Sequence, residues 1–407
     1  MGGGALLKLR AKSYQRLQAL LTLASMSIAR LLSGKRICVC CGSGGVGKTT
    51  TSAAIALGMA SAGAKVAVVT IDPARRLANA LGLHELDNEP RRVSAERLAA
   101  GGVQVRGELW AMMLDPKRTF DELIDRVAGD PERAREVKAN RIYRELSTAV
   151  SGSQEFTAVA KLHELARDGD FDLLVLDTPP SRNAVDFLEA PGRLTAFLEG
   201  RALRAFVRPT GLGMRVLGLG AAPLLGALRR VTGVDLVGDM VTFFALLGGM
   251  TEEFSARAAA VERLLRDERT AFMLVCSTQA EAIEEAIWFC HMLEQGGLPF
   301  AGAIVNRVHP RRRLPDGDGD TTAWLRAELG EDLAARVLDG VEEHRRLARR
   351  DARSLARLRA HVGGRPLIPL PHLDGDVHDI EGLARVQELL FTPGRAQRPR
   401  SPSKVSA

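Results

Sequence analysis

The sequence feature that most constrains the fold is a glycine-rich run after a short apolar stretch. The run reads Gly42-Ser43-Gly44-Gly45-Val46-Gly47-Lys48-Thr49-Thr50 and matches the pattern G-x-x-x-x-G-K-[ST]. An apolar strand is predicted over Ile37–Cys41 before it, and a helix of small residues over Thr50–Ala60 after it. In that context, backbone N–H groups converge on phosphate oxygens, and the helix N-terminus adds its positive end. The run therefore predicts a site for a nucleoside triphosphate.

The same run assigns roles to individual side chains. Lys48 is placed to reach the β- and γ-phosphates, and the Thr49 hydroxyl to bind Mg²⁺. The run also contains G-x-G-x-x-G, the dinucleotide fingerprint, which does not need Lys-Thr after its last glycine and expects an acid about 20 residues on. The first acid here is Asp72. We therefore predict ATP and Mg²⁺ as the ligands, with a purely structural strand-to-helix loop as the alternative.

Short apolar runs alternate with helical stretches along the rest of the chain. The runs lack polar alternation, as in strands that are buried on both faces of a parallel sheet. This alternation predicts an α/β fold of the P-loop NTPase type: a doubly wound, mostly parallel sheet with an inserted helical subdomain. The remaining strands are predicted over Lys65–Thr70, Leu173–Leu176, Ala271–Ser277, Gly302–Val305 and Pro366–Leu370, and the remaining helices over Glu155–Ala166, Asn183–Leu198, Glu281–Glu294 and Ile380–Leu390.

Changes of composition divide the chain. We predict a basic N-terminal extension over residues 1–34, an ATPase core over 35–199 and 268–391, and a disordered tail over 392–407. A helical insertion over 200–267 separates the two parts of the core. A second insertion, 308–360, opens with a Pro/Gly/Asp loop and continues as an Arg-rich helix. Residues 206–250 hold nine glycines among many leucines, a composition that favours a mobile, adaptable apolar segment.

The net charge of +7 belongs to the two ends of the chain. Residues 1–36 carry seven Lys/Arg and residues 392–407 carry four, both without acids, so the body between them sums to −4. With only 4% aromatic residues as well, we expect no nucleic-acid partner. The basic, helically spaced N-terminal stretch could contact anionic lipid, or it could be a packing helix or an over-long start upstream of Met26. Five cysteines without a disulfide framework fit a reducing compartment, and we expect a cytoplasmic protein with transient membrane association.

Two acids follow predicted strands. Leu173-Leu-Val-Leu-Asp177 ends in a carboxylate that Thr178-Pro179-Pro180 follows, and Asp72 follows Val66–Thr70 in the same way. An aspartate beside a phosphate loop, at the carboxyl edge of a parallel sheet, is typical of a residue that binds Mg²⁺ directly or through water. We predict this role for Asp177. Asp72 is the candidate to orient the attacking water. Alone, such an aspartate is more often a turn former or a helix cap.

In this order the motifs resemble those of the arsenical pump-driving ATPases and of the related ATPases that guide tail-anchored proteins to membranes. The details are similar to a bacterial, actinobacterial-like branch. The resemblance spans about 35–390 and adds the stretches Ala303–Arg307 and Pro366–Pro371. It implies that Gly42 to Thr49 bind the phosphates, that Thr49 and Asp177 hold Mg²⁺, and that Asp72 orients the water. It also implies that Asn306 reads the adenine edge with the Pro369–Pro371 loop, and that Gln279 lies near the nucleotide where relatives often carry glutamate.

The resemblance also implies partners. It suggests a dimer whose two nucleotide sites face each other, and a helical surface over about 200–267 for a hydrophobic client or a membrane-protein partner. The alternative for that segment is a plain helical lid. The zinc-binding Cys-x-x-Cys of some relatives is absent: Cys38, Cys40 and Cys41 lie on the first predicted strand, where thiols usually behave as small core hydrophobes. We therefore expect no structural metal.

One departure affects the functional prediction. Ser43 stands where the family usually carries a lysine that reaches the partner's phosphates, so a homodimer and a heterodimer with a paralogous ATPase both stay open. Arg75 or Arg76 are alternative sources of that charge. The leading hypothesis is an Mg²⁺-dependent ATPase that couples nucleotide state to the helical surface. The alternative is a poorly hydrolysing, nucleotide-dependent scaffold subunit, and the partition or division-site ATPases fit less well.

Overall fold

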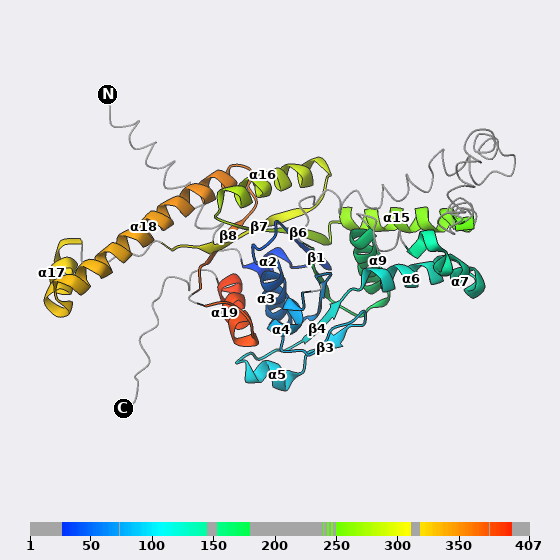
Figure 1. Ribbon diagram of the computed structural model, residues 1–407, viewed down its shortest axis with the longest axis horizontal. Helices are drawn as coiled ribbons and strands as arrows, with labels where there is room; N and C mark the ends of the chain where they lie inside the picture. Colours follow the sequence, from blue (N-terminus) through cyan, green and yellow to red (C-terminus); the bar gives the residue numbers. More distant parts are fainter. Residues whose placement is uncertain are drawn as a thin grey trace, which may run out of the picture.

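The computed structural model describes residues 27–72, 74–144, 153–179, 239, 242–243, 246, 250–310, 318–373 and 375–392. An eight-stranded sheet forms its centre, with strand order β3-β4-β2-β5-β1-β6-β7-β8 (Figure 1). All neighbouring strands pair in parallel except β3 and β4, which are antiparallel. The strands are β1 Ile37–Cys41, β2 Lys65–Thr70, β3 Arg91–Arg92, β4 Glu108–Met113, β5 Leu173–Asp177, β6 Thr270–Ser277, β7 Phe300–Val308 and β8 Leu367–Pro371.

Helices cover both faces of this sheet. One face packs against α2, α3, α4, α5 and α19, and the other against α9, α15, α16 and the C-terminal end of α18. The bounds are α2 Ile28–Leu31, α3 Lys48–Ser61, α4 Arg76–Ala80, α5 Ala95–Ala100, α6 Pro116–Val127, α7 Pro131–Ala139, α9 Ser153–Asp168, α15 Thr251–Arg266, α16 Ala280–Gln295, α17 Asp318–Leu329, α18 Glu331–Arg359 and α19 Ile380–Phe391.

The central strand β1 explains why the predicted strands read as unbroken apolar runs. Cys38 and Cys40 join the core beside α3 and α19, whereas Ile37, Val39 and Cys41 join the core on the opposite face. Successive side chains of a strand point to opposite faces, so a strand with helices on both sides needs apolar residues at every position. Every residue of β1 is buried.

The predicted α/β fold is confirmed, and each predicted strand coincides with an observed one. β3 and β4 were not predicted, because β3 consists of two exposed arginines and β4 holds no β-branched residue. Ile28 and Leu32, within the predicted N-terminal extension, are fully buried in the core. The helix predicted over Asn183–Leu198, residues 1–26, almost all of 206–250 and the tail after Thr392 lie outside the described residues. The domain boundaries stay predictions.

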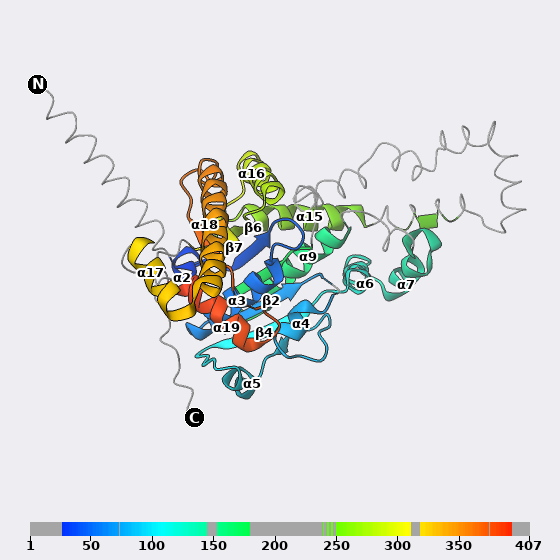
Figure 2. The ribbon, with the colours of Figure 1, turned by 60° about the vertical axis from the view of Figure 1, so that its left-hand side comes forward.

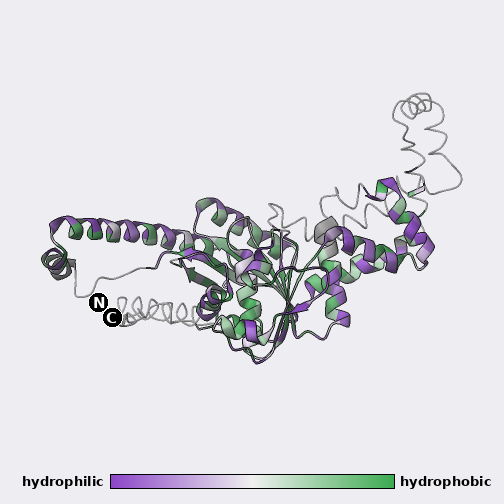
Figure 3. Cartoon of the chain, turned by 60° about the horizontal axis from the view of Figure 1, so that its bottom comes forward, coloured by the Kyte–Doolittle hydropathy of each residue, from purple (hydrophilic) through white to green (hydrophobic). Residues whose placement is uncertain are grey.

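The longest helix, α18, extends well beyond the sheet and carries α17 at its far end (Figure 1). Its C-terminal part lies beside α16 (Figure 2). Hydrophilic residues dominate its surface, whereas hydrophobic residues gather in the body (Figure 3). Asp351 anchors it: this fully buried carboxylate accepts a hydrogen bond from the backbone N–H of His309 at 2.9 Å and lies 2.7 Å from Nδ1 of the same histidine.

Candidate nucleotide site

The phosphate loop connects β1 to α3 at the carboxyl edge of the sheet. Gly42 has φ of 146°, and a Cβ built there would lie 1.9 Å from the carbonyl oxygen of Val275 on β6, so only glycine fits. The Lys48 ammonium folds back over the loop and donates a hydrogen bond to the carbonyl oxygen of Ser43 at 2.8 Å. Burial lowers the pKa of Lys48, and the nearby Asp177 and Asp72 oppose that shift. The lysine therefore closes the loop through a bond that a phosphate can replace.

Asp177 lies beneath the loop at the end of β5. One carboxylate oxygen, Oδ2, accepts hydrogen bonds from Thr49 Oγ1 at 2.7 Å and from Thr70 Oγ1 at 2.9 Å. The other oxygen, Oδ1, is buried without a hydrogen-bond partner among the described residues. Burial raises the pKa of Asp177 to about 6, although the hydrogen bonds from Thr49 and Thr70 act in the opposite direction. The protein thus holds an incompletely satisfied carboxylate next to the phosphate loop.

This arrangement fits Mg²⁺. The Thr49 hydroxyl and the two oxygens of Asp177 form an oxygen-only donor set, which is what this hard cation prefers. A buried polar atom without a partner costs free energy, and a cation with its water ligands would satisfy Oδ1 of Asp177.

Asp72 follows β2 at the same edge. Its backbone N–H donates to Thr70 Oγ1 at 3.2 Å, and its Oδ1 accepts from the backbone N–H of Ala74 at 3.0 Å. Its Oδ2 lies 4.0 Å from Nε of Arg76, and the carboxylate is 19% exposed. Thr70 therefore connects the two acids, because its hydroxyl donates to Asp177 and accepts from Asp72.

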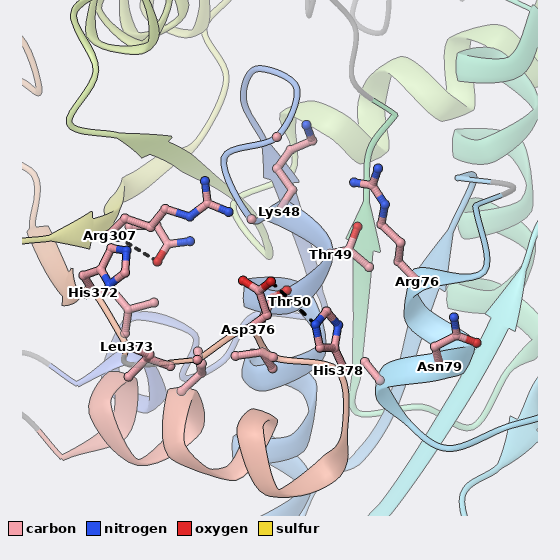
Figure 4. A pocket seen from close by; sticks show the side chains of 18 of the residues that line it. Lys48, Thr49, Thr50, Arg76, Asn79, Arg307, His372, Leu373, Asp376 and His378 are labelled. Atoms are coloured by element: carbon pink, nitrogen blue, oxygen red, sulfur yellow. Dashed lines mark hydrogen bonds and ion pairs between the residues drawn. The ribbon is translucent and has the colours of Figure 1, made fainter.

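A cavity of about 560 Å³ opens over these groups. Figure 4 shows Lys48 and Thr49 of α3 between two walls, with Arg76 and Asn79 of α4 on one side and Arg307 and His372 on the other. The lining is formed by Gly44, Gly45, Gly47, Lys48, Thr49, Thr50, Asp72, Arg76, Asn79, Ala80, Thr178, Asn306, Arg307, Leu370, Pro371, His372, Leu373, Gly375, Asp376, Val377, His378 and Val386.

Asn306 ties the far wall of the cavity to the phosphate loop. It lies near the end of β7, and its side-chain Nδ2 donates a hydrogen bond to the carbonyl oxygen of Val46 at 2.9 Å. Its Oδ1 accepts from the backbone N–H of Arg307, which has the left-handed φ of 59°. The amide thus braces the loop, and reading the adenine edge stays a prediction for it.

The structure brings most, but not all, of the predicted residues to the cavity. Asp177 lies below it, bonded to Thr49, and Gly42, Ser43 and Val46 belong to the loop without lining the cavity. Gln279 is the N-cap residue of α16 and Pro369 lies within β8; neither lines the cavity. Leu370 and Pro371, which follow Pro369, do.

Several residues of the site were not predicted. Thr70 ends a strand that was predicted, but its contact with Asp177 depends on the β2–β5 register, which pairs these two residues. His372, Asp376 and His378 lie between β8 and α19, where the sequence carries no phosphate-binding pattern. Only the order of strands in the sheet shows that this connection faces the phosphate loop.

No helix in the described part of the chain has the length and hydropathy to cross a bilayer. Comparisons with known proteins give relatives of two kinds. ATPase GET3 of Malassezia globosa is 26% identical over 274 residues, which are 66% of this chain and 71% of the relative. A putative arsenical pump-driving ATPase of Aquifex aeolicus is 28% identical over 283 residues, 68% of this chain and 64% of the relative. ATPase get3 of Schizosaccharomyces pombe is 24% identical over 359 residues, 86% of this chain and 90% of the relative.

These relatives come from fungi and a bacterium, so the resemblance to a bacterial branch stays a prediction. The family model of the anion-transporting ATPases matches residues 35–319, more than half of the chain and the whole of the phosphate loop. The chain belongs to the family of anion-transporting ATPases and is an ATPase of the P-loop type.

Proposed function

We propose that the protein binds Mg²⁺ and ATP in this cavity, hydrolyses ATP to ADP and phosphate, and uses the change to control a helical client- or partner-binding surface. The observation that carries the proposal is the hydrogen bond between Thr49 Oγ1 and Asp177 Oδ2, directly beneath the phosphate loop. It joins the two residues whose predicted role is the metal, although they are 128 positions apart in the sequence.

The residues of the loop act first. When a triphosphate enters, the Lys48 ammonium exchanges the Ser43 carbonyl oxygen for phosphate oxygens, a charge-assisted bond that is stronger than the one it replaces. The glycines present backbone N–H groups to the same oxygens, at the N-terminus of the 14-residue helix α3. Bound Mg²⁺ would supply charge neutralisation for the β- and γ-phosphates, held by Thr49 and, directly or through water, by Asp177.

Asp72 acts on the attacking water. Its carboxylate lines the cavity, and its position is fixed by the Ala74 N–H and by Thr70. We assign to it the orientation of a water whose oxygen forms the new bond to the γ-phosphorus. The bond from that phosphorus to the β–γ bridging oxygen breaks, ADP leaves with the electron pair, and the water proton ends on the phosphate released.

The coupling to a partner is the less direct part of the proposal. It is supported by the family, whose members include proteins named arsenical pump-driving ATPase and ATPase GET3. We propose that the protein is cytoplasmic, forms a homodimer or a heterodimer with a paralogous ATPase, and associates transiently with membranes. Its client or membrane-protein partner would bind the predicted helical insertion, residues 200–267. Loss of the γ-phosphate would release the Asp72 and Asp177 loops and move that segment.

Ser43 supports a second candidate, a scaffold subunit that binds ATP but hydrolyses it poorly. Ser43 carries no charge, and its carbonyl oxygen accepts the hydrogen bond from Lys48. A site short of one cation neutralises less of the charge that develops in the transition state.

One set of measurements separates the two. ATP hydrolysis and calorimetric binding of ATP are measured with Mg²⁺ for the wild type, Lys48→Ala and Asp72→Asn, alone and mixed with any paralogous chain. The ATPase hypothesis expects wild-type turnover that falls at least about a hundred-fold in Asp72→Asn, with binding retained, and binding lost in Lys48→Ala. The scaffold hypothesis expects tight binding with negligible phosphate release in every mixture. Equal turnover of wild type and Asp72→Asn would remove Asp72 from the mechanism.

A further inference from the structure

Three strongly basic side chains line the described part of the cavity, each from a different element: Lys48 on α3, Arg76 on α4 and Arg307 at the end of β7. Lys48 is bonded to the loop. Arg307 directly follows Asn306, on the wall formed with the β8–α19 connection. Arg76 comes from the opposite wall, beside Asn79 of α4 (Figure 4).

Arg76 is paired with Asp72 itself. Its Nε lies 4.0 Å from Oδ2 of Asp72, and its side chain is 66% exposed. An exposed pair at this distance is weak and is easily exchanged for a better partner. A terminal phosphate is such a partner, because it offers several anionic oxygens to the planar guanidinium.

The neighbouring Arg75 is about as exposed as Arg76, but it has another partner and lies outside the cavity. Its backbone has the left-handed φ of 55°, its side chain lies 3.9 Å from Glu85, and it does not line the cavity. The geometry therefore separates two arginines that the sequence leaves equivalent.

We propose that Arg76 is the chain's own cation for the terminal phosphate of ATP, and that its ion pair with Asp72 holds that carboxylate back until ATP arrives. The proposal rests on the proposed function and deepens it. With ATP bound, the guanidinium moves from Asp72 to the γ-phosphate, and Asp72 becomes free to accept a hydrogen bond from the attacking water. ADP has no such phosphate, so in its presence Arg76 stays with Asp72. One side chain thus distinguishes the two nucleotides and enables hydrolysis.

The test compares ATP with ADP, because a structural role would not distinguish them. Full-length wild type, Arg76→Ala, Arg76→Lys, Arg75→Ala and, as a control, Arg385→Ala are titrated with each nucleotide in the presence of Mg²⁺, and kcat and KM are measured. Arg385 pairs with Glu381 on the exposed surface of α19, outside the cavity. For Arg76→Ala we expect ATP affinity and kcat to fall about ten-fold or more, with ADP affinity within about two-fold of wild type. Arg76→Lys should recover part of the loss, and Arg385→Ala should match the wild type.

Three outcomes overturn the proposal: equal losses for ATP and ADP, wild-type values in Arg76→Ala, or the ATP-specific loss in Arg75→Ala instead. Because Arg76 is exposed, the thermal midpoint of its nucleotide-free variants should equal that of the wild type, which excludes misfolding as the cause. If the wild type itself fails to bind ATP, the proposed function fails with it. If the wild type binds and hydrolyses ATP while Arg76→Ala does so equally well, only the role of Arg76 fails.

Discussion

The side-chain amide of Asn306 occupies the place that the Cβ of any residue other than glycine would take at position 47. A Cβ built on Gly47 lies 2.3 Å from Nδ2 of Asn306, and that nitrogen donates to the Val46 carbonyl oxygen at 2.9 Å. The phosphate loop and the end of β7 are therefore fitted to each other across 260 positions of sequence.

Gly47→Ala should displace this contact and weaken ATP binding by about ten-fold or more, or about 1.4 kcal/mol, because the loop must move and the φ of 94° disfavours a side chain. Gly63→Ala is the matched control, since Gly63 has φ of 113° but nothing within 4 Å of its built Cβ. It should lower thermal stability and leave ATP affinity unchanged. Adding Asn306→Ala to Gly47→Ala should restore part of the binding. Calorimetric titration with ATP compares the wild type, Gly47→Ala, Gly63→Ala and the double variant. A wild-type ATP affinity in Gly47→Ala would show that the contact between position 47 and Asn306 does not shape the loop.

Asp177 should make stability depend on pH in a specific direction. Burial raises its pKa from 3.8 to about 6, so between these values the folded chain holds a proton that the unfolded chain releases. The contribution of Asp177 to stability therefore decreases as pH rises through this window, by up to about 3 kcal/mol, and the deficit remains above it. Asp177→Asn should become progressively more stable than wild type from pH 4 to 6, as measured by urea unfolding. A constant difference across that range would show that the carboxyl does not titrate there.

The same carboxyl should set a lower limit of pH for nucleotide binding. Below about pH 6 the protonated Asp177 no longer attracts a cation, so affinity for ATP with Mg²⁺ should fall as the pH decreases. Thr70→Val removes a hydrogen bond that lowers this pKa, so it should move the midpoint to higher pH. Binding of ATP without metal provides the comparison, and an identical pH dependence with and without Mg²⁺ would contradict the assignment of Asp177.

The anchor of α18 should be costly to break. Burial alone would raise the pKa of Asp351, but hydrogen bonds from the His309 backbone and ring, Thr278 and Arg350 hold it below its ordinary value. A lowered pKa means that the carboxylate stabilises the fold above the unfolded-state pKa, and that this contribution is lost as pH falls through the folded-state pKa. Asp351→Ala should therefore lower the free energy of unfolding at pH 7 by about 3–5 kcal/mol.

His309→Ala removes only the ring from that anchor and should cost about 1–3 kcal/mol. The exposed pair Arg385–Glu381 is the control, and Arg385→Ala should change the free energy by less than about 1 kcal/mol. Urea unfolding of the three variants decides the point. An Asp351→Ala variant as stable as the control would mean that α18 is held by its apolar contacts alone.

The five cysteines should be unreactive in the folded protein. All are free and buried, and burial raises the pKa of Cys276 and of Cys290 to about 12. Because the thiolate is the reactive form, an aromatic disulfide reagent should label none of them rapidly under native conditions and all of them in denaturant. For the same reason arsenite should not stimulate ATP turnover through these thiols. Rapid labelling of the native protein, or stimulation that is lost on replacing a cysteine, would contradict this.

The phosphate loop and the main strands were predictable because their signals are local. The glycines of the phosphate loop, such as Gly42 and Gly47, lie within one short stretch of sequence. Each strand that is buried on both faces is likewise recognisable from its own run of apolar residues. The same holds for Asp72, two positions after the end of β2, and for Asp177, the last residue of β5. Local signals identify the parts of the site without showing their contacts.

The contacts themselves depend on strand order and register, which no local pattern encodes. Thr70 reaches Asp177 only because β2 pairs with β5 in one register. The contact between Asn306 and Val46 depends on the strand order, in which β6 lies between β1 and β7. The different partners of Arg75 and Arg76 depend on the turn between β2 and α4. Strand β4, the neighbour of the edge strand β3, was missed because it holds no β-branched residue.

The place of β1 in the sheet has a mechanical consequence. Its neighbours are β5 and β6, which are consecutive strands in the chain yet lie on either side of it. In the sequence, residues 178–269 connect the end of β5 to β6, and α15 lies at the C-terminal end of this connection. A force on that connection would therefore act on both β5 and β6, the two strands that are hydrogen-bonded to β1, and β1 leads into the phosphate loop. Force on this connection should therefore weaken nucleotide affinity, and bound nucleotide should in turn resist displacement of the connection.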